Sequence, residues 1–276
     1  MNKKVFIYHA NCPDGFGSAW AAWKKFGNKA TYIGAEHHTL PPEGLEGADL
    51  CFMDFTYPKA ITDELKKKAA SITIIDHHVT AKEITESVPN HSYAIDNSGA
   101  VLTWKYFHPK KPVPKLLLNI EDADLWKFKI KDTPEIISAL YLYKMDFKIW
   151  SKIARDLENK KTLVQIIGVG RGVLTYKNKL IEEIASGAKM VEFEGYKTLI
   201  ATSPAAIHSE LGNALVTKLP PIGIVYRESD KKTKISLRSD GSVDVSKIAE
   251  KYGGGGHHNA AGFIVKTGES LPWKVI

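Results

Sequence analysis

Asp76, His77 and His78 follow directly after a run of β-branched residues. That run, Ile72–Ile75, is typical of a buried strand, so the three ionisable side chains are expected at the strand's carboxyl end. Two adjacent histidines and an acid have no packing reason to lie there. Imidazole and carboxylate groups are ligands for Mn²⁺, Fe²⁺ and Zn²⁺, so this segment indicates a metal site.

Similar residues end other predicted strands. His9 ends the first one, with Asp14 a little further along the chain, and Asp54 ends another. Ligands of an open parallel sheet bind beyond the carboxyl ends of its strands, so these side chains converge if the strands are neighbours. Carboxylates gathered at one point repel each other unless cations lie among them. Two cations about 3.5–4 Å apart are a usual arrangement for phosphoester hydrolysis.

Some of these side chains have a purely structural alternative. Asp14 precedes a predicted helix and could simply cap it. Asp54 alone could be a buried polar group with satisfied hydrogen bonds. We interpret the pair His37-His38, which follows another predicted strand, as structural, because no matching motif accompanies it.

The elements that must position these residues alternate in the first half of the chain. We predict strands over 3–9, 30–35, 48–55 and from residue 71, with helices over 17–27 and 58–70. This alternation predicts an α/β domain with a parallel sheet and helices on both of its faces.

The rest of the chain is first mostly helical and then β-rich. Helical spacing prevails from about residue 112 and includes a long helix over 172–190, and β-rich runs return after Gly195. We therefore expect a metal-binding catalytic domain with a helical extension over 1–171, a linker helix over 172–191, and a smaller α/β substrate-binding domain over 192–276.

Composition limits the partners. No apolar run approaches the roughly 20 residues that cross a bilayer, so no membrane partner is expected. The chain has only two cysteines, which favours a reducing cytoplasm. Its net charge of +7 indicates either a solvated lysine-rich surface or an anionic partner. Because the lysines lie in small groups, a short anionic ligand fits better than a long duplex. A homodimer is compatible with the sequence.

A glycine run near the C-terminus is a second candidate site. Gly253–Gly256 lack a Cβ and can present backbone N–H groups to an anion, and His257 and His258 follow. A flexible hinge is the alternative. Arg238 lies in a predicted strand, where it is either a phosphate ligand or a surface arginine.

Together these motifs resemble the DHH phosphoesterase superfamily and its DHH-associated C-terminal domain, which includes nanoRNases and RecJ-like oligonucleotide phosphodiesterases. The resemblance rests on IIDHH, HANCPDGFGSA, FMDF and IEDADLW in the first half of the chain, and on ISLRS and GGGGHHNAAGF near its end.

The resemblance implies a role for each matching residue. Asp54 would bridge two ions, Asp76 would orient a neighbouring ligand, and His78 would be the catalytic donor at the phosphate. The implied metal ligands are His9, Asp14, Asp54, His77 and Asp122, with Asp124 as the alternative to Asp122. The implied phosphate ligands are Arg238, Gly254, Gly255, Gly256, His257 and His258.

The first motif departs from the family pattern. Cys12 stands where the family usually has an aspartate, with Asn11 beside it. A thiolate would bind a soft metal and an amide oxygen a hard one. If neither binds, the first ion is held weakly, so we expect two divalent ions, or one, with Mn²⁺ preferred.

The implied function is metal-dependent hydrolysis of short single-stranded oligonucleotides or dinucleotides to mononucleotides. One alternative is a small-molecule phosphatase acting on pyrophosphate or a nucleoside bisphosphate. The other alternative is a nucleotide-binding protein that has lost catalysis. It is suggested by Cys12, which stands where the family usually has an aspartate.

Overall fold

The computed structural model describes residues 2–36, 39–229 and 232–276, so the pair His37-His38 lies outside the described residues. The chain forms two compact units that meet between Val173 and Leu174. That boundary lies inside one continuous helix, α8 (Lys160–Ser186), which begins well before the expected residue 172 and ends before 190. Among the described residues, no helix has the length and apolar character needed to cross a bilayer.

A parallel sheet forms the centre of the first unit. Its strand order is β2-β1-β3-β4-β5, and every neighbouring pair is parallel. The strands are β1 (Lys4–His9), β2 (Thr31–Ala35), β3 (Asp49–Met53), β4 (Ser71–Asp76) and β5 (Asn90–Tyr93). The predicted α/β class with a parallel sheet is therefore confirmed.

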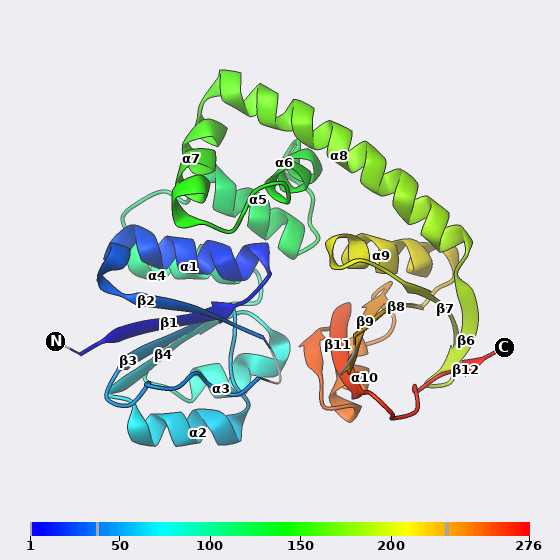
Figure 1. The fold of residues 1–276 in the computed structure, drawn as a ribbon, viewed down its shortest axis with the longest axis horizontal. Coiled ribbons are helices and arrows are strands. Elements are labelled where there is room, and N and C mark those ends of the chain that lie inside the picture. The colour runs from blue at the N-terminus through cyan, green and yellow to red at the C-terminus, as the bar shows by residue number, and fades with distance from the viewer. Residues whose placement is uncertain (1, 37–38, 230–231) are drawn as a thin grey trace. The chain divides into compact units, whose positions relative to one another are not determined.

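Helices cover both faces of this sheet (Figure 1). The upper face in that view carries α1 (Pro13–Phe26) and α4 (Gly99–Phe107), and the lower face carries α2 (Lys59–Lys68) and α3 (Lys82–Glu86). Side chains alternate along β1: Phe6 packs into one apolar core, whereas Val5 and Ile7 pack into the other. Burial on both faces explains why these strands are nearly continuous apolar runs.

Further helices extend the core on the α1 side. They are α5 (Lys115–Asp124), α6 (Thr133–Leu140), α7 (Phe147–Glu158) and the first part of α8. Trp20 of α1 is fully buried among them and donates a hydrogen bond from Nε1 to Oγ of Ser151 on α7, at 3.0 Å. This layer fixes the start of α1, where Asp14 lies.

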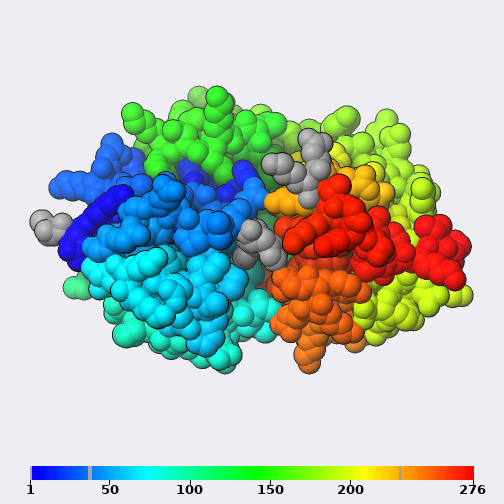
Figure 2. All heavy atoms as spheres, turned by 60° about the horizontal axis from the view of Figure 1, so that its bottom comes forward, coloured from blue at the N-terminus to red at the C-terminus, as the bar shows by residue number. Residues whose placement is uncertain are grey.

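The second unit contains a larger, mostly antiparallel sheet. Its order is β10-β11-β9-β8-β7-β6-β12, and β7 and β8 pair in parallel. The strands are β6 (Lys189–Phe193), β7 (Tyr196–Thr202), β8 (Ile222–Glu228), β9 (Lys232–Ser239), β10 (Gly255–His257), β11 (Ala260–Lys266) and β12 (Lys274–Val275). The helices are α9 (His208–Lys218) and α10 (Val245–Lys251). Figure 2 shows the C-terminal residues of this unit in red.

Candidate metal centre

Strand register brings three of the predicted side chains to one edge of the parallel sheet. Tyr8 of β1 lies opposite Met53 of β3, and Met53 lies opposite Ile75 of β4. The next residue along each strand is therefore His9, Asp54 or Asp76, and the three follow one another across the sheet edge.

Asp54 is the central residue of this edge. Its Oδ1 lies 3.1 Å from Nε2 of His77, and its Oδ2 lies 3.5 Å from Nδ1 of His9. The side chain is almost fully buried, and Oδ2 accepts no hydrogen bond from any described residue. Burial opposes ionisation, but the hydrogen bond from His77 and the neighbouring imidazoles of His9 and His78 lower the pKa of Asp54 well below its usual range.

The backbone at Asp54 is unusual too. Its φ of 53° is left-handed, a conformation that aspartate tolerates better than most residues. The N–H of Asp54 still donates to the carbonyl of Ile75, at 2.9 Å, so the strand ladder continues up to the turn. Strained backbone of this kind is common at functional sites.

A second group of candidate ligands lies around the same ring nitrogen of His77. Nε2 of His77 lies 3.6 Å from Oδ2 of Asp14 and 3.7 Å from Oδ2 of Asp124. Burial and the nearby carboxylates of Asp54 and Asp124 raise the pKa of Asp14 well above its usual range. Carboxylates crowded in this way are stabilised by a bound cation.

The amino end of α4 holds Asp14. The N–H of Gly99 donates to Oδ2 of Asp14 at 2.7 Å, and the N–H of Ala100 donates to Oδ1 at 3.0 Å. A Cβ at residue 99 would lie 2.5 Å from Cβ of Asp54 and 2.9 Å from Oδ2 of Asp14. Only glycine fits there, although the sequence analysis did not single out this residue.

Cys12 lies with His9 and Asp54, and not with the second group. One potential ligand atom from each of these three residues lies within 4.8 Å of the other two. Burial raises the pKa of the Cys12 thiol well above its usual value, and the negative charges of Asp54 and Asp124 raise it further. A thiol in these surroundings stays protonated until a cation offsets the negative charges.

Asn11, the other candidate at this position, is engaged elsewhere. Its Nδ2 donates to Oε1 of Glu36 at 3.2 Å, on the exposed surface. The residue has a left-handed φ of 57°, which asparagine tolerates well. Of the two residues, the structure therefore brings Cys12 to the cluster.

The structure places Asp124 in the cluster rather than Asp122, which the sequence analysis preferred. Oδ1 of Asp122 accepts from the N–H of Lys129 at 2.8 Å, and its Oδ2 accepts from the N–H of Ile130 and from Oγ1 of Thr133. Asp122 thus secures the loop between α5 and α6. We correct the candidate ligand set by replacing Asp122 with Asp124.

Asp76 orients the ring of His78, and it belongs to neither group of candidate metal ligands. Oδ1 of Asp76 accepts from Nδ1 of His78 at 2.8 Å and from the N–H groups of His77 and His78. Its Oδ2 accepts from Oγ1 of Thr56 at 2.7 Å, a partner that the sequence analysis missed. Burial opposes ionisation of Asp76, but the charge and hydrogen bonds of His78 lower its pKa to about 2.

These donors fit divalent cations. Imidazole, carboxylate and thiolate are all metal ligands, and two groups of them meet at Asp54 and His77. The buried Oδ2 of Asp54, which lacks a hydrogen-bond donor among the described residues, is the atom that a cation would satisfy.

The second unit carries the predicted phosphate ligands. Nη2 of Arg238, on β9, donates to Oγ of Ser209 at 2.7 Å, and Nη1 donates to the carbonyl of Leu237. Burial lowers the pKa of Arg238 to about 10. A Cβ at Gly212 would lie 2.7 Å from Cγ of Arg238, so α9 packs closely on this side chain.

Packing explains the glycine run of the second unit. A Cβ at Gly254 would lie 2.1 Å from the carbonyl oxygen of Gly262, and Gly256 has a φ of 143°. Gly255 and Gly256 pair with β11, and the N–H of Gly254 donates to the carbonyl of Ala249. The run is thus ordered and bonded, which speaks against a flexible hinge.

The two histidines after this run lie at the end of β10. His257 is the last residue of that strand, opposite Ala260. The ring of His258 contacts Oδ1 of Asn259 at 2.6 Å, and the carbonyl of His258 accepts from the N–H of Val245. The backbone of His258 thereby joins the start of α10.

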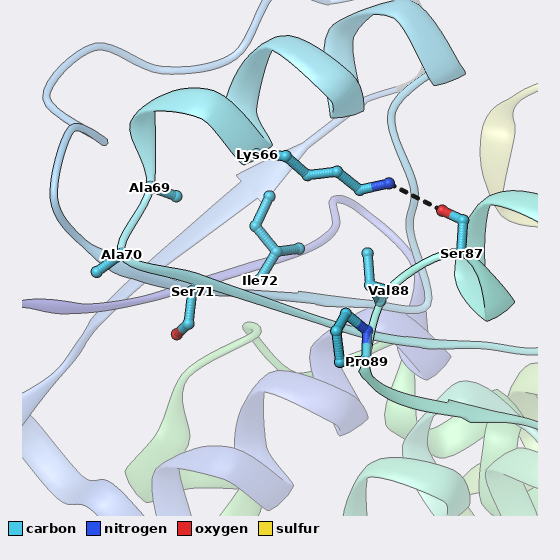
Figure 3. A pocket seen from close by; sticks show the side chains of 8 residues that line it. All are labelled: Lys66, Ala69, Ala70, Ser71, Ile72, Ser87, Val88 and Pro89. Carbon is cyan, nitrogen blue, oxygen red and sulfur yellow. Dashed lines mark hydrogen bonds between the residues drawn. The ribbon is translucent and has the colours of Figure 1, made fainter.

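A pocket of about 150 Å³ lies at the other end of β4 (Figure 3). Ser71 and Ile72 line it at the start of the strand, and Lys66 reaches across it to donate to Oγ of Ser87 at 3.0 Å. Because Asp76 ends the same strand, this pocket does not belong to the metal centre.

Residues 203–272 match the DHHA1 domain family, and a comparison with curated proteins identifies relatives. Uncharacterized protein R106 of Acanthamoeba polyphaga mimivirus is 32% identical, over 94% of this chain and 66% of that protein. A 3',5'-cyclic-nucleotide phosphodiesterase of Helicobacter pylori is 23% identical, over 76% of this chain and 72% of that protein. Oligoribonuclease NrnB of Bacillus subtilis is 45% identical over 56 residues, which are 20% of this chain and 14% of that protein.

A solved structure shares the fold. Exonuclease RecJ bound to manganese matches with a TM-score of 0.52 and 16% identity, over 95% of this chain and 86% of that one. The likeness covers both units of the chain. Together with the DHHA1 match and the two phosphodiesterase-type relatives, it confirms the resemblance that the sequence motifs indicated.

Proposed function

Because the chain belongs to the DHH phosphoesterase superfamily and carries a DHHA1 domain, we propose that it is a metal-dependent phosphodiesterase that hydrolyses short single-stranded oligonucleotides or dinucleotides to mononucleotides. The observation that carries this proposal is the position of Asp54. Asp54 forms one group of potential ligands with His9 and Cys12. Its Oδ1 lies 3.1 Å from Nε2 of His77, which belongs to the second group.

In this proposal two ions would lie beside Asp54. His9, Cys12 and Asp54 would hold the first, and Asp14, His77 and Asp124 would hold the second together with Asp54. When bound, divalent ions lower the pKa of a water molecule and neutralise charge on the phosphoryl oxygens. Mn²⁺ is the ion we propose for assay, because it accepts both imidazole and carboxylate ligands.

His78 is the proposed proton donor. Asp76 accepts from its Nδ1, which orients the ring and leaves Nε2 to donate to a phosphate oxygen or to the leaving oxygen. Burial disfavours the charged ring, but the carboxylate of Asp76 raises the pKa of His78 overall. The side chain is about a fifth exposed, which gives a substrate access to it.

The second unit is proposed to bind the substrate's phosphate. Arg238 has a planar guanidinium group that suits a phosphate, and Ser209 fixes one side of it. His257 and His258 are proposed as further contacts. We also propose a cytoplasmic location, since both cysteines are free thiols.

A nucleotide substrate is favoured over pyrophosphate because two relatives are described as a nucleotide phosphodiesterase and an oligoribonuclease. The test is a panel of di- to pentaribonucleotides, a cyclic dinucleotide and pyrophosphate, each incubated with the full chain and Mn²⁺. We expect mononucleotides from the short oligonucleotides. Turnover of pyrophosphate alone would favour the phosphatase alternative, and nucleotide binding without turnover would favour the binding protein.

Asp54→Asn is the decisive variant in this assay. It should lose at least about 100-fold in activity, since even residues that only support metal ligands contribute 10–100-fold. Asp63→Asn is the matched control, because Asp63 forms an ion pair with Lys59 on the exposed surface of α2. A folded Asp54→Asn protein with full activity would exclude this metal centre as the active site.

A further inference from the structure

The thiol of Cys12 is the one unusual donor in the metal centre. Cys12 lies at the turn between β1 and α1, where it is the residue before Pro13. Its Sγ, a ring nitrogen of His9 and a carboxylate oxygen of Asp54 lie within 4.8 Å of one another. A set with one nitrogen, one sulfur and one oxygen donor differs from the second group, whose donors are carboxylates and His77.

Structural roles do not account for this thiol. Cys12 is the N-cap residue of α1, yet its side chain makes no capping hydrogen bond. It forms no disulfide, because Cys51, the other cysteine of the chain, is also a free thiol and lies buried within β3. Pro13 supplies the preset backbone of the first helical turn, so the start of the helix does not require a thiol.

A second observation points to a ligand at the same place. Oδ2 of Asp54 is buried and accepts no hydrogen bond from any described residue, although the side chain is only 2% exposed. This oxygen lies 3.5 Å from Nδ1 of His9, and Cys12 belongs to the same group of potential ligands. A cation there would satisfy the carboxylate.

We propose that Cys12 binds a divalent cation through Sγ, together with His9 and Asp54, and that the two metal sites of this chain therefore prefer different ions. The inference rests on the proposed function, in which the centre holds metal. Soft thiolate ligands favour Zn²⁺, Fe²⁺ or Co²⁺, whereas carboxylates suit Mn²⁺ and Mg²⁺. The site of Cys12 selects the softer ions, and the site of Asp14 and Asp124 accepts the harder ones.

The test is a titration of the full metal-free chain with Co²⁺, followed by near-ultraviolet absorption. A sulfur ligand gives a thiolate-to-cobalt charge-transfer band, which oxygen and nitrogen ligands do not. We expect the band in the wild type, its loss in Cys12→Ser, and its retention in Cys51→Ala, which is the matched control. Bound metal is counted in parallel by equilibrium dialysis with Co²⁺ and with Mn²⁺.

Alkylation of the wild type keeps the proposal testable if Cys12→Ser fails to fold. We expect Co²⁺ to protect Cys12 from iodoacetamide at least tenfold better than Mg²⁺ does, as read by mass spectrometry of the peptide. Equal protection by the two ions would overturn the proposal.

The outcomes separate this inference from the proposed function. Bound Co²⁺ without a charge-transfer band would overturn the role of Cys12 and leave the metal-dependent enzyme intact. A band that survives in folded Cys12→Ser would also overturn it. A chain that binds neither Co²⁺ nor Mn²⁺ would overturn both.

Discussion

Nε2 of His77 lies 3.1 Å from Oδ1 of Asp54, although 23 residues separate them in the chain. The contact joins the ends of two neighbouring parallel strands, β3 and β4. It also joins the two groups of candidate ligands, since His77 faces Asp14 and Asp124. A change that shifts either strand end should therefore affect both candidate metal sites.

Gly99→Ala should reduce activity by disturbing this junction. The added Cβ would lie 2.5 Å from Cβ of Asp54, so the start of α4 must move away from Asp14. We expect a loss of stability of about 1–3 kcal/mol, as for other overpacked sites, together with weaker Mn²⁺ binding. Thermal unfolding and Mn²⁺ titration measure the two effects.

Gly168→Ala is the matched control for that variant. Gly168 lies within α8, and an added Cβ would meet no atom within 4 Å. Alanine should therefore stabilise the helix by about 0.5–1 kcal/mol and leave Mn²⁺ binding unchanged. Equal losses of Mn²⁺ affinity in both variants would contradict the role given to Gly99.

Asp122→Ala and Asp124→Asn should have opposite effects. Asp122→Ala removes the acceptor for two backbone N–H groups and Thr133, which should cost about 1–3 kcal/mol of stability and leave metal binding intact. Asp124→Asn removes one of the crowded carboxylates, so the metal-free protein should be as stable as the wild type or more so.

Melting temperatures with and without Mn²⁺ separate the two aspartates. A bound metal stabilises the folded state by mass action. The gain in Tm on adding Mn²⁺ should therefore persist in Asp122→Ala and shrink in Asp124→Asn. The reverse pattern would restore Asp122 as the ligand.

His108 should make the stability of the first unit depend on pH. Its ring is buried and its Nε2 contacts the carbonyl of Ala21 at 2.9 Å. Burial and nearby lysines lower the pKa of His108 below its ordinary value of 6.5. The unfolded chain therefore takes up a proton first as the pH falls. The stabilisation is complete above about pH 6.5 and is lost as the pH falls toward the lowered pKa.

His108→Gln tests this dependence. Glutamine keeps a donor for the carbonyl of Ala21 but does not titrate. The drop in Tm between about pH 7.5 and pH 5.5 should be smaller in this variant than in the wild type. His91→Gln, at an exposed histidine, should keep the wild-type drop. An unchanged drop in His108→Gln would show that other groups set the acid sensitivity.

Arg238→Lys should raise KM for a dinucleotide at least about tenfold, because lysine cannot donate two parallel hydrogen bonds to a phosphate. Arg227→Lys on β8 is the matched control, since Arg227 is exposed. Steady-state kinetics report KM and kcat separately. A fall in kcat with KM unchanged would remove Arg238 from substrate binding.

The sequences of the strands and of the residues that end them made the sheet and the candidate metal centre of the first unit predictable. Apolar runs with acids and histidines at their carboxyl ends fix both the parallel sheet and the edge where Asp54 and His77 meet. The spacing of Asp122 and Asp124 does not reveal which of them turns inward, because that depends on where the loop after α5 places its N–H groups. Thr56 and Gly99 were missed because neither type of residue signals chemistry by itself.

Two backbone N–H groups donate hydrogen bonds to the carboxylate of Asp14, and they belong to Gly99 and Ala100. These residues follow Asp14 in the chain by 85 and 86 positions. We therefore expect the carboxylate of Asp14 to be oriented only after α4 has docked. Metal binding at Asp14 should follow that folding step. A nascent chain that stops before Gly99 contains His9, Asp54 and His77. It lacks the two backbone N–H groups that orient Asp14.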